Sequence, residues 1–134
     1  MILINFSLIF SVLLFFQACD SDWTEFNGHC YRISQNASPW SASFLDCKLN
    51  QANLVSITSR EENRFIMSMV HKTQPCWIGL IETGTIAEWG NGEHFAYNVI
   101  NRSASRQGEN YVIVNGLWET ANASAAYPYI CEKP

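Results

Sequence analysis

The chain has 134 residues, enough for one domain and too few for two of ordinary size. Its formal net charge is −4, only 15% of its residues are charged, and it contains no run of basic residues. Nucleic acids and anionic membrane surfaces are bound through clustered Lys and Arg, so neither is expected as a partner.

The N-terminal segment, residues 1–18, has no charged side chain, and its middle is almost wholly apolar. The apolar core, Phe6 to Phe16, has about the length of the apolar region of a secretory signal peptide and is short for crossing about 30 Å of hydrocarbon. A buried strand or helix, a retained membrane anchor and a lipoprotein with lipid on Cys19 are the alternatives. We predict a signal peptide over residues 1–18 and one secreted domain over residues 19–134, with no membrane span after cleavage.

The first part of the mature chain, residues 23–33, indicates two short extended pieces around a turn at Asn27-Gly28. A helix follows, with Ser38 predicted as its N-cap and Pro39 as its first helical residue. Near-helical spacing of apolar residues predicts that one face of this helix packs inward; these residues are Trp40, Phe44, Cys47 and Ala52.

A short strand-like link over residues 54–57 leads to a second helix. Ser59 with Glu62 three positions later forms a capping box at its start. Its apolar stripe consists of Phe65, Ile66, Met69 and Val70.

The second half of the chain indicates strands and one long loop. Residues 76–80 predict a buried strand, and residues 81–107 predict a loop with little regular structure, a kind of segment that often carries function. Two more strands are expected at residues 111–114 and 127–131, with a hairpin turn at Asn115-Gly116. Helices followed by strands and a large loop indicate an α+β domain.

Five cysteines follow the predicted cleavage point, and in an oxidising compartment they are expected to form disulfides. Three N-glycosylation sequons agree with passage through the secretory pathway; they begin at Asn36, Asn101 and Asn122.

The ordered set of Cys, Trp and Gly residues resembles the C-type lectin-like domain family across the whole of residues 19–134. The motifs that carry the resemblance are Cys19-x3-Trp23-x2-Phe26-x-Gly28-x-Cys30-Tyr31, Trp77-Ile78-Gly79-Leu80, Gly116-x-Trp118 and Tyr129-Ile130-Cys131-Glu132. The resemblance implies a fold of two helices, small antiparallel sheets and a long loop region. It also implies two disulfides, Cys19–Cys30 and Cys47–Cys131.

A further disulfide that the family usually has across its binding loops is missing here. Tyr111 stands where its first cysteine is expected, and residues 120–126, where the second is expected, contain none. The loop region is therefore expected to be held less tightly.

The resemblance also raises the question of calcium, through which lectins of this family bind sugar. The family supplies ligands from Glu-Pro-Asn or Gln-Pro-Asp in the loop and from Trp-Asn-Asp on the next strand. Here the corresponding residues are 99–103, which lack a proline, and Trp118-Glu119-Thr120. Glu109 matches a third ligand, so Glu109 and Glu119 are residual metal candidates. We expect no cofactor, and calcium in particular is not expected to bind.

Residual ligand-binding candidates lie in and around the predicted loop: Trp89, Asn98, Glu109, Asn110 and Glu119. Trp89, at the edge of the predicted loop, could offer its ring to a sugar, although core packing is the default expectation for a tryptophan. Glycans on Asn101 and Asn122 would crowd this face, so we expect that binding uses another one.

Cys76 has no partner in the family pattern. One interpretation is a buried free thiol that acts as a small apolar side chain. The other is an intermolecular disulfide that links a homodimer.

The sequence favours binding over catalysis. The chain has no His-Glu-x-x-His zinc motif, no Gly-x-Ser-x-Gly nucleophile elbow and no phosphate-binding loop. The prediction is a secreted, non-enzymatic binding protein that recognises a glycan or protein ligand outside the cell without calcium. The alternative is a secreted scaffold with an inhibitory, toxin-like or structural role, and a hydrolase is a distant third.

Overall fold

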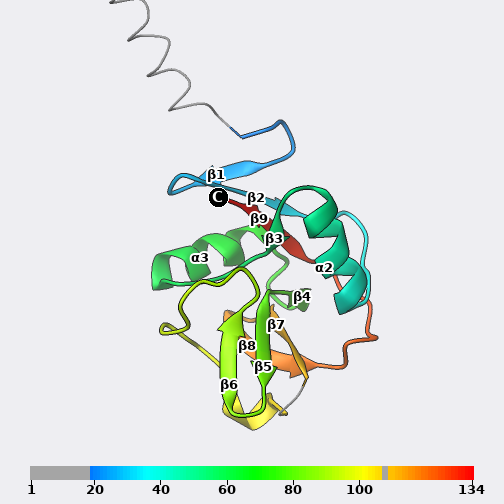
Figure 1. Ribbon diagram of the computed structural model, residues 1–134, viewed down its shortest axis with the longest axis vertical. Coiled ribbons are helices and arrows are strands. Elements are labelled where there is room, and N and C mark those ends of the chain that lie inside the picture. Colours follow the sequence, from blue (N-terminus) through cyan, green and yellow to red (C-terminus); the bar gives the residue numbers. More distant parts are fainter. Residues whose placement is uncertain (1–18, 107–108) are drawn as a thin grey trace, which may run out of the picture.

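The computed structural model describes residues 19–106 and 109–134. It confirms an α+β fold in which two helices accompany three small antiparallel sheets. In Figure 1 the four-stranded sheet lies at one end of the domain and the β5–β6 hairpin at the other, with the two helices between them. The elements in chain order are β1 (Thr24–Phe26), β2 (His29–Ile33), α2 (Trp40–Leu49), β3 (Asn53–Leu54), α3 (Arg60–Met69), β4 (Cys76–Trp77), β5 (Leu80–Thr83), β6 (Ile86–Trp89), the 3-10 helix η1 (Arg102–Ala104), β7 (Asn110–Val114), β8 (Leu117–Ala121) and β9 (Ile130–Lys133).

The four-stranded sheet brings the two ends of the domain together in the order β1-β2-β9-β3. The predicted turn between β1 and β2 is confirmed, since Asn27 and Gly28 have φ angles of 50° and 81°. Both residues occupy the left-handed region that tight hairpins require and that Asn and Gly tolerate best. Strand β9 then pairs with β2 and β3, so the last strand lies between segments from the first half of the chain.

Helix α2 begins one residue later than expected. Pro39, with φ −61°, is the N-cap, and no side chain caps the helix. Ser38 instead forms an isolated bridge with Tyr127, and its hydroxyl lies 2.8 Å from the hydroxyl of Ser43. The prediction of Ser38 as N-cap was therefore wrong, because pairing with the C-terminal segment holds its backbone and the pair with Ser43 engages its side chain.

Helix α3 begins as predicted at an N-cap Ser59, whose hydroxyl accepts a hydrogen bond from the backbone N–H of Glu62 at 3.1 Å. The reciprocal half of the capping box is shifted by one residue. The Glu62 carboxylate accepts from the backbone N–H of Thr58 at 2.8 Å rather than from that of Ser59. The carboxylate therefore also fixes the segment that leads into the helix.

The buried strand expected at residues 76–80 is divided between two sheets. Cys76 and Trp77 form β4, which pairs with β7, whereas β5 starts at Leu80 and pairs with β6. Gly79 lies at the division, and a Cβ atom there would come within 2.6 Å of the carbonyl oxygen of Leu54. Only glycine allows the backbones to approach so closely.

The expectation of little regular structure over residues 81–107 was wrong for its first part. Strands β5 and β6 form a hairpin in which Leu80 pairs with Trp89 and Thr83 pairs with Ile86. Gly84, with φ 65°, makes the tight turn. The sequence signal for this hairpin was Gly84 between two short segments rich in β-forming residues. Polar and small residues around these segments obscured the signal.

Two groups of buried side chains form the core, and alternation along β4 separates them. Cys76 belongs to the first group together with Ile78 and Leu80, whereas Trp77 belongs to the second. The hairpin turn between β7 and β8 is confirmed, with φ angles of 54° at Asn115 and 79° at Gly116. It places Trp118 in the first group, where the side chain is fully buried.

No helix within residues 19–106 and 109–134 is long and apolar enough to cross a membrane. The predicted signal peptide and residues 107–108 of the predicted loop lie outside the described part of the chain.

Candidate functional site

Polar side chains of the predicted loop, the ligand-binding candidate Asn98 among them, make hydrogen bonds to the protein. The Asn98 side-chain oxygen accepts a hydrogen bond from the backbone N–H of Ile100 at 3.3 Å. The Asn101 side-chain oxygen accepts one from the Ser103 hydroxyl at 2.8 Å, and the Thr120 hydroxyl accepts one from the backbone N–H of Arg106 at 2.7 Å. The first two bonds lie within the loop, and the third joins the loop to β8.

The remaining loop candidates lie on the β7–β8 pair. Asn110 starts β7 opposite Ala121, and Glu119 lies two residues before Ala121, so Asn110 and Glu119 share one face of the sheet. Glu109 directly precedes β7, and all three side chains are half-buried. Within the described residues, no group of three or more His, Cys, Asp or Glu side chains is arranged to hold a metal ion.

Trp89 is a core residue and not a surface for sugar stacking. Its side chain is 2% exposed, and its ring packs edge-on against Trp118 at a centroid distance of 5.2 Å. The hypothesis of a sugar-stacking role was therefore wrong, because the unpredicted β5–β6 pairing places Trp89 opposite Leu80 and turns the ring inward.

The three sequons lie at the surface but differ in local geometry. At Asn122 the side-chain oxygen accepts hydrogen bonds from both the hydroxyl and the backbone N–H of Ser124, at 2.7 and 3.0 Å. Asn101 is half-buried and has the analogous bond to Ser103, whereas Asn36 is exposed and the hydroxyl of its Ser38 pairs with Ser43. Glycosylation at these positions stays a prediction.

Both disulfides implied by the resemblance are present, Cys19–Cys30 and Cys47–Cys131. Cys76 is free and 1% exposed, and burial raises the pKa of its thiol to about 12. A disulfide to a second copy would require β4 to leave the core, so the structure favours the buried-thiol interpretation.

A buried carboxylate pair that sequence reasoning did not identify lies where β2, β9 and α3 meet. Glu62 accepts a hydrogen bond from the Tyr31 hydroxyl, and Glu132 accepts from the backbone N–H and hydroxyl of Ser56 at 3.1 and 3.2 Å. His29 Nδ1 lies 3.2 Å from Glu132, within ion-pair distance but outside hydrogen-bond geometry. Burial, followed by the nearby Glu62 charge, raises the pKa of Glu132, and the Ser56 and His29 interactions oppose this shift.

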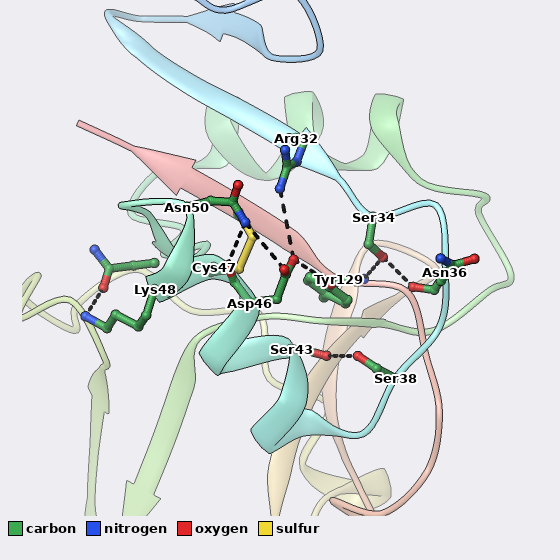
Figure 2. The surroundings of a disulfide bond; sticks show 12 residues. Arg32, Ser34, Asn36, Ser38, Ser43, Asp46, Cys47, Lys48, Asn50 and Tyr129 are labelled. Carbon is green, nitrogen blue, oxygen red and sulfur yellow. Dashed lines mark hydrogen bonds and ion pairs between the residues drawn. A yellow bond between two sulfur atoms is a disulfide. The ribbon is translucent and has the colours of Figure 1, made fainter.

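A polar groove of about 540 Å³ lies between β2 and α2, away from the predicted loop. Figure 2 shows Arg32 reaching from β2 toward Asp46 on α2, with Tyr129 on the other side of Asp46. Arg32 Nη2 lies 4.0 Å from Asp46 Oδ2, and the Tyr129 hydroxyl donates to the same oxygen at 2.7 Å. The groove lining consists of Asp22, Arg32, Ile33, Ser34, Gln35, Asn36, Asp46, Tyr129 and Cys131.

Desolvation and the hydrogen bond to Asp46 raise the pKa of Tyr129 to about 12, so its phenol stays protonated and remains a donor at neutral pH. No sequence motif joins Arg32, Asp46 and Tyr129, which are far apart in the chain, so the groove could not be found by reading along the sequence. The nearest signal was that Asp46 and Tyr129 lie beside the half-cystines Cys47 and Cys131.

Comparison with known proteins agrees with this architecture. The model of the lectin C-type domain matches residues 36–133. Human asialoglycoprotein receptor 2 is 30% identical over 130 residues, which cover 86% of this chain and 40% of the receptor. The chain therefore spans well under half of the length of this curated relative.

Two solved structures show the same fold. The carbohydrate-recognition domain of the mouse scavenger receptor C-type lectin has a TM-score of 0.77 and 26% identity, covering 86% of this chain and 95% of that one. Herring type II antifreeze protein has a TM-score of 0.79 and 25% identity, covering 87% and 98%. The family model matches more than half of the chain, and the motifs, disulfides and fold agree with it. The chain belongs to the C-type lectin domain family.

Proposed function

We propose that this protein is a secreted, non-catalytic binding protein that recognises a glycan or protein ligand outside the cell without calcium. The segment over residues 1–18, the disulfides and the three sequons support an extracellular location. The relatives support binding as the role of the domain, since one of them is a carbohydrate-recognition domain by name.

The observation that carries calcium independence is the scarcity of carboxylates at the positions that supply calcium ligands in the family. Calcium requires about six to eight oxygen ligands at 2.3–2.6 Å. In this loop the side-chain oxygens of Asn98 and Asn101 accept protein hydrogen bonds, and the Thr120 hydroxyl accepts one from Arg106. At the positions that supply calcium ligands in the family, only Glu109 and Glu119 carry a carboxylate. Among the described residues no group of three or more His, Cys, Asp or Glu side chains is arranged to hold a metal ion, so these two carboxylates supply too few oxygens to replace the hydration shell of the ion.

The test is a glycan array probed with the full secreted protein, once with calcium and once with a chelator. We expect the same glycans to be bound under both conditions. The matched control is the double variant Glu109→Gln, Glu119→Gln, which should bind as the native chain does. Binding that appears only with calcium and disappears in the double variant would contradict calcium independence. The absence of glycan binding under both conditions would instead favour a protein ligand or the scaffold role.

A further inference from the structure

We propose that the groove between β2 and α2 is the binding site for a neutral saccharide, with Arg32 and Asp46 as the residues that hold its hydroxyl groups. The proposal rests on the glycan branch of the proposed function and assigns it a location. The charged side chains and the rigid walls both support it.

Arg32 presents hydrogen-bond donors that the described part of the protein does not use. Its guanidinium lies 4.7 Å above the ring of Trp23, and its side chain is 24% exposed. Its only polar partner among the described residues is Asp46, at 4.0 Å, which is too long for a direct hydrogen bond. A guanidinium has five N–H donors in a fixed plane, so several of them remain available to a ligand in the groove.

Asp46 presents the matching acceptor. Its Oδ2 accepts from the Tyr129 hydroxyl at 2.7 Å, which fixes the orientation of the carboxylate. Its Oδ1 has only a long contact of 3.4 Å from the Asn50 side chain. Each carboxylate oxygen can accept more than one hydrogen bond, so Asp46 retains capacity toward the groove.

The 4.0 Å separation between Arg32 and Asp46 fits a bridging hydroxyl. A hydroxyl group can accept from a guanidinium and donate to a carboxylate at the same time, and hydrogen bonds to charged partners are the stronger kind. The opposite charges of this pair balance each other, and Asp22 adds a negative charge at the groove. An anionic sugar would therefore be repelled, whereas a neutral sugar would pair its hydroxyls with both groups.

The groove walls are fixed by bonds that exist before any ligand arrives. The Cys47–Cys131 disulfide ties α2 to β9 beside Asp46, as Figure 2 shows. The Ser34 hydroxyl donates to the carbonyl of Asn36 at 2.8 Å and accepts from the backbone N–H of Tyr129 at 3.0 Å. A site that needs no ordering on binding loses less conformational entropy when the ligand binds.

Of the three predicted glycan sites, only Asn36 is among the residues that line the groove. Asn101 lies beside β8, where its backbone N–H donates to the carbonyl of Trp118, and Asn122 directly follows β8. Asn36 lines the groove itself, so a glycan attached there would lie against the site. The experiment therefore includes the variant Asn36→Gln, which removes that sequon.

The experiment measures binding of the neutral array glycans by the Asn36→Gln protein in chelator, and then compares Arg32→Met and Asp46→Asn in the same background. Arg32→Met keeps an apolar stem over Trp23, and Asp46→Asn keeps an acceptor for Tyr129. Loss of a hydrogen bond to a charged group predicts about a tenfold or greater weakening in each variant. Glu109→Gln, directly before β7 and outside the groove lining, is the matched control and should change the affinity less than twofold.

Backbone amide shifts in NMR spectra, recorded with the bound glycan, identify the location independently. We expect shifts at Ser34, Gln35 and Tyr129, which line the groove, and unchanged spectra for residues 98–101. Glycan binding that survives both groove variants, or shifts confined to the loop, would overturn the groove while leaving the proposed function intact. If the protein is correctly folded by circular dichroism and binds no neutral glycan on the array, the proposal that the groove binds a saccharide is wrong. The glycan branch of the proposed function would then be wrong as well.

Discussion

The two ends of this molecule are stabilised by different means. The sheet end, formed by β1, β2, α2, β3 and β9, contains both disulfides. The loop end, formed by β5, β6, η1, β7 and β8, contains none among the described residues, and Tyr111 stands where the family usually has a cysteine. In its place the Tyr111 hydroxyl donates to Glu82 at 2.7 Å, which joins β7 to the β5–β6 hairpin.

Hydrogen bonds from the core also hold the loop end. The indole N–H of Trp118 donates to the Asn63 side-chain oxygen at 2.9 Å, and the Asn63 amide donates to the carbonyl of Gly116 at 3.1 Å. Helix α3 is therefore linked to the β7–β8 turn and to β8. In this chain, hydrogen bonds of Tyr111 and Asn63 therefore link the loop end, which has no disulfide among the described residues.

The largest expected effect comes from the long disulfide of the sheet end. The Cys47→Ala, Cys131→Ala variant loses a cross-link between positions 84 residues apart. The chain-entropy model predicts a loss of about 4.5 kcal/mol in the free energy of unfolding. The matched control, Cys19→Ala with Cys30→Ala, removes a cross-link over only 11 residues and should lose about 3 kcal/mol. Urea denaturation measures both, and an equal or larger loss in the control would contradict the model.

Next in size is the link between α3 and the loop end. Asn63→Ala would leave the buried Trp118 indole N–H without a partner, because Asn63 is its acceptor and is itself 8% exposed. An unpaired buried donor predicts a loss of about 2 kcal/mol in unfolding free energy. Gln74→Ala, at an exposed position, should change stability by less than about 0.5 kcal/mol. A loss in Asn63→Ala no larger than this control would show that the link contributes little.

Tyr111→Phe tests the contact that stands in place of the disulfide. Removal of its hydroxyl should cost about 1 kcal/mol, since Glu82 is half-buried and regains some water. Hydrogen exchange should accelerate in β5 and β6 more than in β2 and β9. Tyr97→Phe is the control, because the Tyr97 hydroxyl makes no hydrogen bond within the described residues. Equal exchange in all four strands would mean that Tyr111 does not hold the hairpin.

The smallest effect concerns the buried carboxylates of the sheet end. The pKa of Glu132 is raised in the folded protein, so folding favours its protonated form. Its contribution to stability is therefore fully present below the unfolded pKa and is lost as the pH rises through the folded pKa. Urea denaturation at pH values from 4 upward should show a weaker decline with pH in Glu132→Gln than in the native chain. Parallel curves for the two proteins would contradict the assignment to Glu132.

The sequence was sufficient for features that depend on local chemistry. The turns at Asn27-Gly28 and Asn115-Gly116 were predicted because few residues tolerate their φ angles, and the Ser59 cap because hydroxyls satisfy free helix N–H groups. The family pattern added the disulfides Cys19–Cys30 and Cys47–Cys131, which the structure confirms.

Features that depend on partners distant in the chain could not be predicted in this way. Ser38 was assigned to a helix because its pairing with Tyr127 leaves no trace in local sequence. Trp89 was placed at the loop edge because the β5–β6 pairing that buries it was not recognised. For the candidate site, the sequence located loop residues through the family pattern, but the groove of Arg32 and Asp46 arises only when β2, α2 and Tyr129 are packed together.

The inaccessible thiol in β4 gives the native protein an internal reporter. At neutral pH Cys76 is protonated and shielded, so an alkylating reagent can modify it only after β4 separates from β7. The labelling rate of this single sulfur, followed by mass spectrometry, therefore measures how often the centre of the domain opens. No engineered probe is needed, since the other described cysteines are protected as cystines.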